Sequence, residues 1–330
     1  MRFVVYGAGA VGGVVGGRLA QHGHDVELIA RGPHREAMAA SGLRIDSPEG
    51  SVTVSVPVHE HPGGVDWRPG DVVILAMKGQ DTETALLALR AAAGAEIPIV
   101  CLQNGVANER RALRRFADVY GICVMCPAGH LEPGVVVAYS SPLAALLDIG
   151  RYPRGADDLC EAVAAAVNAS GMESVVRPDI MRWKHAKLLM NLGNAIGALC
   201  GPEARGGPLN ELVRDEGEAC LRAAGIDFAS ADEDRARRAD KLRLAPVAGH
   251  SRFGDSSWQS LARGTGAIET DFLNGEIVLL GRRYGVATPA NALLQSLATR
   301  AAVERQPAGS VDLEEILDRL RESRPPAPPP

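Results

Sequence analysis

Short apolar segments alternate with segments of helical spacing over roughly the first half of the chain. Strands are predicted where residues are apolar throughout or alternate with polar ones, at residues 2–6, 25–30, 43–46, 51–58, 71–77, 97–102, 120–125, 135–138 and 144–149. Helices are predicted between strands at residues 11–21, 84–93 and 108–116. Strands that alternate with helices form parallel βαβ units, and the strands after residue 119 are expected to extend the same sheet.

After residue 178 the strand pattern gives way to helical spacing. Helices are predicted at residues 181–199, 209–224, 231–242, 257–284, 289–305 and 313–322. The fold class is therefore α/β, with an N-terminal Rossmann-type doubly wound sheet followed by an all-α C-terminal domain. The expected ranges are residues 1–176, residues 177–322, and a disordered Pro-rich tail at 323–330, whose composition suits neither helix nor sheet.

Composition excludes several classes of protein. Hydrophobic residues make up 46% of the chain and charged residues 23%, which is typical of a soluble globular protein. No apolar run approaches the ~20 residues of a membrane span, and no leader pattern precedes the first strand, so a cytoplasmic location is expected. The net charge of −5 does not indicate the basic surface expected of a protein that binds nucleic acid. The six cysteines are expected to be reduced thiols.

A glycine-rich turn joins the first strand to the first helix. It consists of Gly7, Ala8, Gly9, Ala10, Val11 and Gly12, which together match GxGxxG. In a dinucleotide site the first glycine permits the tight turn, the second lets the backbone approach the pyrophosphate, and the third allows close packing of helix and strand. Because a strand precedes this motif and a helix follows it, the turn predicts a dinucleotide cofactor.

The end of the second strand favours NADPH over NADH. NAD enzymes place Asp or Glu there for the ribose 2′-hydroxyl, but this chain has Ala30 followed by Arg31. A guanidinium suits a 2′-phosphate in both charge and geometry, and His34 and Arg35 could add to the same pocket. The cofactor predicted is therefore NADPH/NADP.

A narrow polar stripe runs along the predicted helix at 181–199. On an uninterrupted helix, Lys184, Lys187, Asn191 and Asn194 share one side, and most of the remaining surface is apolar. Asn is a poor helix former, and the chain contains only four lysines, two of which lie on this stripe. The stripe therefore predicts the polar lining of a cleft, although a solvent-exposed helix face is the alternative.

Several motifs together resemble the ketopantoate reductases, the NADPH-dependent enzymes of pantothenate synthesis. They are Gly-Ala-Gly-Ala-Val-Gly-Gly at residues 7–13, Ala-Met-Lys at 76–78, Gln-Asn-Gly at 103–105, Lys-Leu-Leu-Met-Asn at 187–191, and the stretches Ser-Ser-Trp-Gln and Glu-Thr-Asp-Phe-Leu-Asn-Gly between residues 256 and 275. The resemblance extends to about residue 293. It implies hydride delivery from NADPH to a 2-keto acid, with ketopantoate as first choice.

The resemblance also implies roles for individual residues. Lys187 matches the lysine that acts as general acid on the developing alkoxide, and Glu269 the glutamate that holds both that lysine and the substrate. The other matched positions are Asn191 and Ser257 for the substrate, Lys78 for the cofactor, and Asn104 for both the nicotinamide and the substrate. A protonated amine near the carbonyl oxygen can stabilise the charge and donate the proton, which is why the reaction needs a lysine there.

Some alternatives stay open. The family's second asparagine falls on Ala195, so Asn194 lies one position early. A substrate role for Asn194 from the Lys187 face of the helix is one interpretation, and another small 2-oxo acid or an opine-type reaction is the runner-up. A non-catalytic NADPH-sensing protein would need neither Lys187 nor Glu269. Ser256 with Gln259 resembles a capping box, which would leave Ser257 as an ordinary first helical residue. No metal site is expected, because Cys123 and Cys126 lie in an apolar strand, and a homodimer is one arrangement that the helical faces allow.

Overall fold

The chain folds into two compact units in the computed structural model, which describes residues 1–251 and 254–322. The first unit comprises Met1–Ala186 and Ala229–Arg252, and the second comprises Lys187–Phe228 and Phe253–Pro330. The expected ranges of 1–176 and 177–322 differ from this division, because the first unit extends into the next helix and regains a later segment. The tail expected at 323–330 lies outside the described residues.

A seven-stranded sheet forms the centre of the first unit. Its strand order is β12-β8-β7-β6-β1-β2-β5, and every pair is parallel except β12 with β8. The strands are β1 (Arg2–Tyr6), β2 (Asp25–Ile29), β5 (Val58–His59), β6 (Asp71–Leu75), β7 (Ile99–Cys101), β8 (Val119–Met125) and β12 (Leu146–Arg151). This confirms the predicted doubly wound sheet.

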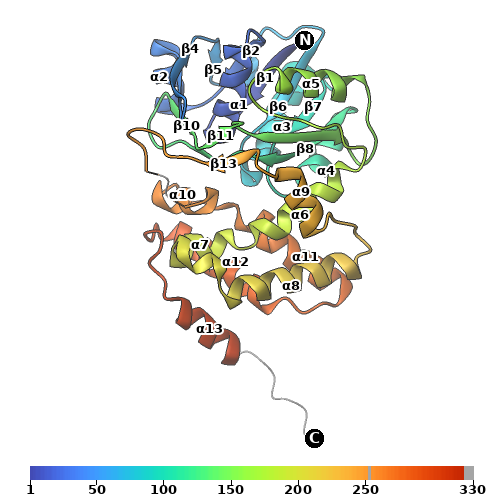
Figure 1. The fold of residues 1–330 in the computed structure, drawn as a ribbon. Coiled ribbons are helices and arrows are strands. Elements are labelled where there is room, and N and C mark those ends of the chain that lie inside the picture. Colours follow the sequence, from blue (N-terminus) through green and yellow to red (C-terminus); the bar gives the residue numbers. More distant parts are fainter. Residues whose placement is uncertain (252–253, 323–330) are drawn as a thin grey trace, which may run out of the picture. The chain divides into compact units, whose positions relative to one another are not determined.

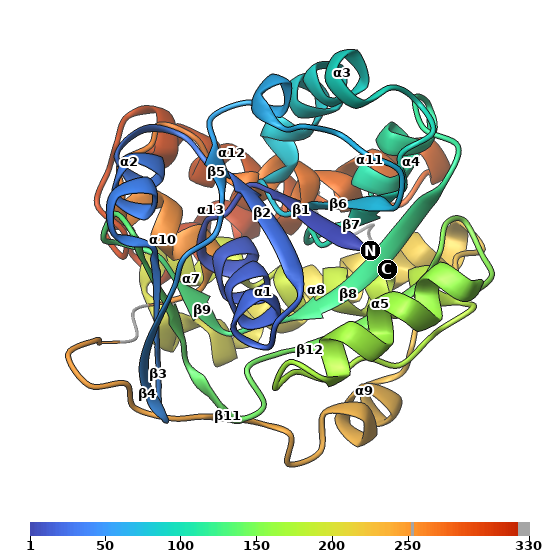
Figure 2. The same ribbon diagram turned by 90° about the horizontal axis from the view of Figure 1, so that it is seen from above.

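Helices cover both faces of this sheet. Figure 2 shows α1 (Ala10–Gln21) and α5 (Asp158–Asn168) on one face, with α3 (Thr82–Ala93) and α4 (Asn108–Leu113) on the other. Alternate residues of each strand point to opposite faces, so Phe3 and Val5 of β1 join one buried apolar cluster while Val4 joins the other. Burial on both faces explains why these strands are apolar throughout.

A smaller sheet packs beside the main one, in the order β4-β3-β10-β9. Its strands are β3 (Leu43–Ser47), β4 (Gly50–Val54), β9 (Ala128–Gly129) and β10 (Val135–Ala138). The strand predicted at 43–46 is confirmed as β3, which pairs antiparallel with β4, but two expectations are wrong. The strand at 135–138 pairs with β3 instead of extending the main sheet, and the run at 51–58 divides between β4 and β5, with Pro57 just before β5.

The segment Ala229–Arg252, which follows part of the second unit in the chain, belongs to the first unit. It contains α9 (Ala231–Arg238) and β13 (Leu242–Leu244), and β13 pairs with β11 (Ser140–Pro142). Buried Arg237 forms an ion pair with Asp148 of β12 at 2.5 Å. The helix expected at 231–242 ends early at Arg238, because Ala239 adopts a positive φ of 39° and Leu242 already begins β13.

The second unit is helical, as predicted. Its elements are the end of α6 (Ile180–Asn191), α7 (Asn194–Cys200), η3 (Pro202–Gly206), α8 (Pro208–Ala223), α10 (Ser256–Ala262), η4 (Glu269–Phe272), α11 (Asn274–Tyr284), α12 (Pro289–Val303) and α13 (Leu313–Glu322), which are labelled in Figure 1 where there is room. The single helices expected at 181–199 and 257–284 are wrong. Leu192 and Gly193 form a turn in the first, and Gly264 and Gly266 adopt positive φ within the second.

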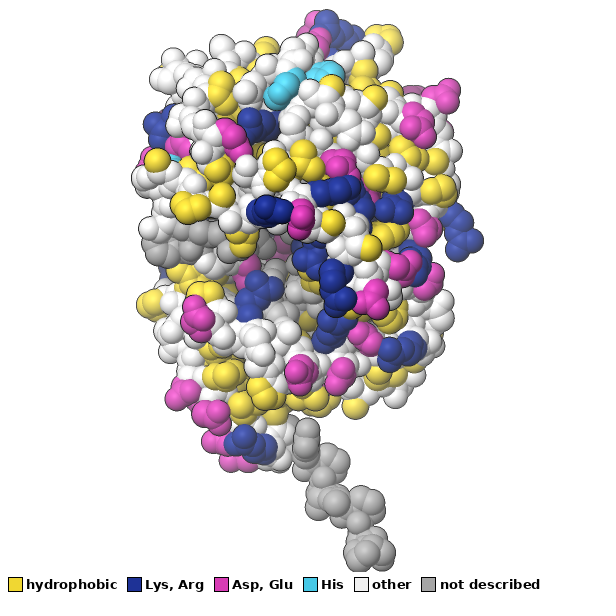
Figure 3. Space-filling view, in the orientation of Figure 1, with side chains coloured by type: hydrophobic (Ala, Val, Ile, Leu, Met, Phe, Trp, Pro, Cys, Tyr) yellow, Lys and Arg dark blue, Asp and Glu magenta, His cyan; other side chains and the backbone are white. Residues whose placement is uncertain are grey.

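The surface is of mixed charge. Acidic and basic side chains are interspersed over the face seen in Figure 3. Among the described residues, no helix combines the length and the hydropathy needed to cross a membrane.

Candidate active site

The glycine turn has the geometry of a dinucleotide-binding turn. Gly7 has φ of +100°, and a Cβ there would lie 2.6 Å from the backbone nitrogen of Met77. A Cβ on Gly12 would lie 2.4 Å from the Gly7 carbonyl oxygen, whereas a Cβ on Gly9 would meet nothing within 4 Å. The first and third glycines are thus required by packing. The second leaves open space at the start of α1, where a pyrophosphate can approach the backbone.

Four predicted cofactor segments lie at one edge of the main sheet. The glycine turn follows β1, Arg31 follows β2, Lys78 follows β6, and Asn104 follows β7. These four strands are parallel neighbours in the order β7-β6-β1-β2, so their carboxyl ends share an edge. The strand order reverses at β1, and ligands of doubly wound sheets bind outside the carboxyl ends at such a reversal.

Arg31 presents an accessible positive charge at this edge. It immediately precedes α2 (Gly32–Ser41), its side chain is 73% exposed, and its nearest acidic group, Asp81, lies 3.7 Å away. An ion pair this exposed and this long contributes little, so the guanidinium can turn to a ligand at low cost. This placement agrees with a site for a 2′-phosphate.

His34 holds the glycine turn and does not line an exposed pocket, contrary to the expectation. The backbone N–H of Gly134 donates to His34 Nδ1 at 2.8 Å, which leaves Nε2 to donate to the Ala8 carbonyl at 2.7 Å. Burial, with a smaller contribution from the neighbouring ring of His130, lowers the pKa of His34 to about 4 against the opposing effect of the hydrogen bond to Ala8. The side chain is therefore neutral and structural.

Hydrogen bonds also fix the loops after β6 and β7. Buried Gln103 donates through Nε2 to the Met77 carbonyl at 2.9 Å and to Thr82 Oγ1 at 2.8 Å. Thr82 Oγ1 donates to Asn108 Oδ1 at 3.0 Å, and Asn108 Nδ2 donates to the Asn104 carbonyl at 3.2 Å. The backbone around Asn104 is therefore held from two neighbouring elements.

The polar stripe on α6 is only partly what the sequence suggested. Half-buried Lys187 and buried Asn191 lie on the last turn of α6, but the helix ends at Asn191, and Asn194 is the first residue of α7. The argument that Asn194 shares the Lys187 face of one continuous helix is therefore wrong. All three residues belong to the second unit.

Lys184 is not a cleft residue. Its ammonium lies 2.8 Å from Glu109 Oε1 of α4, and the two side chains are 2% and 0% exposed. It also donates to the carbonyls of Gln103 at 2.8 Å and Ile122 at 3.0 Å. Two carbonyl acceptors and the ion pair with Glu109 thus engage this buried ammonium, which argues against Lys184 as the proton donor to a substrate.

The break between α6 and α7 depends on a buried amide that was not predicted. Asn274, at the start of α11, donates through Nδ2 to the Leu192 carbonyl at 3.0 Å and to Asn291 Oδ1 at 3.0 Å. Asn291 donates in turn to Glu216 Oε2 at 2.8 Å, and Thr270 Oγ1 donates to Asn274 Oδ1 at 3.2 Å. Asn274 belongs to the Glu-Thr-Asp-Phe-Leu-Asn-Gly motif, which was the only sequence signal for it.

Ser257 and Glu269 are both buried in the second unit, 3% and 5% exposed. The helix α10 is capped by Asp255, whose Oδ1 accepts from the backbone N–H of Ser257 at 2.9 Å and of Trp258 at 3.0 Å. The capping box expected at Ser256 is therefore wrong, because the cap lies one residue earlier. Glu269 begins η4 rather than lying within a long helix.

Cys123 and Cys126, which are spaced like the first two ligands of some metal sites, are both free thiols. Cys123 is buried in β8, and burial raises the pKa of Cys126 to about 12. Within residues 1–251 and 254–322, no three His, Cys, Asp or Glu side chains are grouped as metal ligands.

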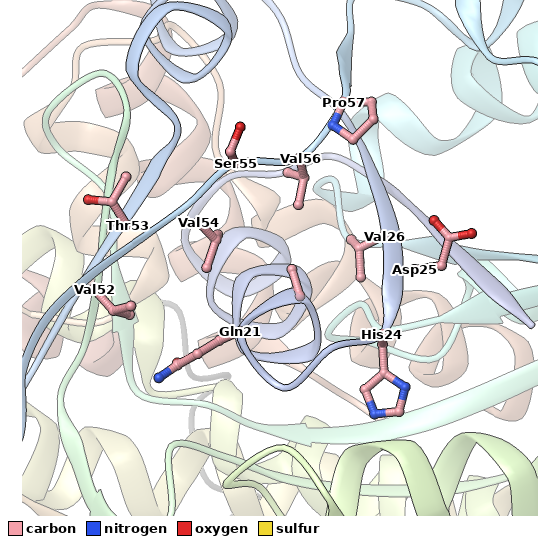
Figure 4. A pocket seen from close by; sticks show the side chains of 11 residues that line it. Gln21, His24, Asp25, Val26, Val52, Thr53, Val54, Ser55, Val56 and Pro57 are labelled. Carbon is pink, nitrogen blue, oxygen red and sulfur yellow. The ribbon is translucent and has the colours of Figure 1, made fainter.

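A surface depression in the first unit lies away from the carboxyl edge of the sheet. Figure 4 shows it between the end of α1 and the chain from Val52 to Pro57, with His24 and Asp25 at the amino end of β2. Because dinucleotides bind at the carboxyl ends of parallel strands, this depression is not the predicted cofactor site.

Comparisons with known proteins identify relatives along nearly the whole chain. A family model described as ketopantoate reductase PanE/ApbA matches residues 3–148, and the model of its C-terminal part matches residues 179–302. The 2-dehydropantoate 2-reductases of Halobacterium salinarum and Pyrococcus horikoshii are 32% and 30% identical, over 91% and 90% of this chain and 99% and 96% of their own. The crystal structure of a PanE/ApbA family ketopantoate reductase from Ralstonia eutropha has a TM-score of 0.77 at 30% identity, covering 93% of this chain and 100% of that one.

Proposed function

Because the chain belongs to the ketopantoate reductase PanE/ApbA family, we propose that it catalyses the NADPH-dependent reduction of 2-dehydropantoate (ketopantoate) to pantoate. The observation that carries the cofactor half of this proposal is the meeting of four chain segments at one sheet edge: the glycine turn, Arg31, Lys78 and Asn104. The open space at Gly9 fits a pyrophosphate that approaches the backbone.

The residues of the first unit would hold the cofactor in a defined orientation. The backbone of residues 7–12 would bind the pyrophosphate, Arg31 the 2′-phosphate, and Lys78 and Asn104 the nicotinamide end. When bound, NADPH supplies the hydride that adds to the carbonyl carbon of the substrate. The absence of an acidic residue directly after β2 supports NADPH over NADH, because a carboxylate there would repel the 2′-phosphate.

The residues of the second unit would bind the keto acid and provide the proton. Lys187 would act as general acid: its ammonium stabilises the developing negative charge on the carbonyl oxygen and then donates a proton to it. Glu269 would hold that ammonium and a substrate hydroxyl. Asn191, Asn194 and Ser257 would add neutral hydrogen bonds that orient the substrate without adding charge. Membership of one unit supports this assignment, as does the burial of the four residues around the half-buried Lys187 in this proposal.

A second candidate substrate is another small 2-oxo acid. The observation that favours it is the position of Asn194, which begins α7 one residue before the position of the family's second asparagine. That difference changes where an amide can meet the part of the substrate beyond the keto group. Cytoplasmic location and homodimer formation stay predictions from the sequence.

The test is oxidation of NADPH by the purified protein in the presence of a panel of small 2-oxo acids. Ketopantoate should give the highest kcat/KM, and NADH should support much slower turnover than NADPH. A higher kcat/KM for a different 2-oxo acid would replace ketopantoate as substrate. If NADPH binds but no keto acid is reduced, the protein is not a reductase and a sensing role replaces this proposal.

A further inference from the structure

The buried ion pair between Lys184 and Glu109 takes no part in the proposed proton transfer. The two side chains are 2% and 0% exposed, and Nζ lies 2.8 Å from Oε1. Transferring two charges from water to a protein interior is costly, and an apolar pair of similar size often serves stability equally well. The pair therefore needs an explanation beyond stability.

The contacts of the Lys184 ammonium lead directly to the sheet edge. In addition to its ion pair with Glu109, it donates to the carbonyl of Ile122 in β8 at 3.0 Å and to the carbonyl of Gln103 at 2.8 Å. A Cβ on Gly121 would lie 3.3 Å from both Lys184 Cδ and Glu109 Oε1, so the glycine leaves room for the pair. Lys184 thus connects the first half of α6 to the residue that precedes Asn104.

The peptide group that follows Asn104 is held by Asn108, the residue directly before Glu109 in α4. Asn108 Nδ2 donates to the Asn104 carbonyl at 3.2 Å, and Glu109 is the next residue of α4. The peptide groups before and after Asn104 therefore each accept a hydrogen bond from a side chain, Lys184 on one side and Asn108 on the other. Loss of either bond would leave one of the two peptide groups that flank Asn104 without its side-chain donor.

We propose that Lys184 is a positioning residue for the nicotinamide: its ammonium, neutralised by Glu109, holds the Gln103 carbonyl and thereby sets the place of Asn104. This inference rests on the proposed function, in which Asn104 contacts the nicotinamide end of NADPH. Lys184 acts only through Asn104 and touches neither cofactor nor substrate.

The test compares two ligands that differ at the nicotinamide. The variant Lys184→Met/Glu109→Leu replaces the buried pair with apolar side chains, so no lone charge is left inside the protein. Calorimetry should show NADPH binding about 3- to 10-fold weaker than in the parent protein, the effect of one lost hydrogen bond. Binding of 2′-phospho-ADP-ribose, which lacks the nicotinamide, should be unchanged, and kcat should fall about tenfold because the reacting groups are misplaced.

A control is the buried pair of Arg2 and Asp71 at the amino end of the same sheet, where the side chains are 5% and 1% exposed; Glu27, the other carboxylate beside Arg2, keeps His59 as a partner at 2.8 Å. The variant Arg2→Met/Asp71→Leu should bind both ligands as the parent does. If the Lys184 double variant does not fold, Lys184→Met/Glu109→Gln is compared in the same way with the same expectations.

Two results would overturn the proposal: unchanged affinity for both ligands, or equal loss of affinity for both, since either outcome makes the pair merely structural. The binding comparison also separates this proposal from the proposed function. A parent protein that binds NADPH but reduces no keto acid would refute only the latter.

Discussion

Three cations that look alike in the sequence have different surroundings in the structure. Lys184 is buried beside Glu109 and donates to two backbone carbonyls, Lys187 is half-buried on the last turn of the same helix, and Arg31 is 73% exposed. A helical wheel gives the direction of a side chain but not its partner. Because Glu109 comes from a distant part of the chain, the stripe could not separate Lys184 from Lys187.

The assigned role of Lys187 predicts the effect of replacing it with arginine. Lys187→Arg should bind NADPH as the parent does, but kcat should fall at least about 10²-fold, because a guanidinium does not release its proton near neutral pH. Steady-state kinetics and calorimetry with NADPH measure the two effects. The control is Lys241→Arg, at a lysine that is 40% exposed and paired with Glu173. This variant should change neither kcat nor NADPH affinity. Unchanged turnover in Lys187→Arg would mean that water or another group supplies the proton.

Arg31 should determine the choice between the two nicotinamide cofactors. Arg31→Asp replaces a cation that attracts the 2′-phosphate with an anion that repels it and can bind a 2′-hydroxyl. The ratio of kcat/KM for NADPH to that for NADH should fall about 10- to 100-fold, as expected for a lost charge-assisted hydrogen bond. Arg68→Asp, near the amino end of β6, should leave the ratio unchanged. A constant ratio in Arg31→Asp would place the 2′-phosphate elsewhere.

At the scale of elements, local patterns predicted the strands better than the helices. The strands of the main sheet are short apolar runs because both faces are covered, and such runs are readily recognised. The break at Leu192 was not predicted, because it depends on a hydrogen bond from Asn274 far along the chain. Gly264 and Gly266 were visible in the sequence, and their positive φ angles explain why one long helix at 257–284 could not form.

The turn between α6 and α7 should be destabilised when Asn274 is replaced by an apolar residue. Asn274→Leu removes the donor to the Leu192 carbonyl and the acceptor for Thr270, and leaves buried polar groups unpaired. Urea unfolding should show a loss of about 2–3 kcal/mol of stability, and turnover should fall more than NADPH affinity, because Asn191 and Asn194 flank the break. Gln295→Leu, which loses only an exposed bond to Asp271, should cost no more than about 0.5 kcal/mol. Equal stability of the two variants would show that the turn holds without Asn274.

At the scale of the whole molecule, the chain passes between the two units three times. Periodicity predicted an α/β part followed by a helical part, and the family comparison agrees. Periodicity could not predict that Ala229–Arg252 belongs to the first unit. That placement involves the pairing of β13 with β11 and the ion pair of Arg237 with Asp148. Local sequence does not encode such long-range partners.

Acid should weaken the folded protein through the histidine that holds the glycine turn. The pKa of His34 is lowered from 6.5 to about 4 by burial, so between these values the unfolded chain binds a proton that the folded protein does not. The stabilisation from a neutral His34 is complete above the higher value and is lost as pH falls through the lower one. The shift corresponds to at most roughly 3 kcal/mol.

Protonation would also place a donor at Nδ1, where Gly134 N–H needs an acceptor, so acid should break the contact with Gly134 and loosen the ring that holds the Ala8 carbonyl. His34→Gln cannot titrate but can still donate and accept. Relative to this variant, the parent should therefore lose urea stability and NADPH affinity between about pH 7 and about pH 4.5. The exposed His22, replaced by Gln, is the control and should leave the parent's pH profile unchanged. Parallel profiles for the parent and His34→Gln would mean that His34 does not couple acid to the cofactor turn.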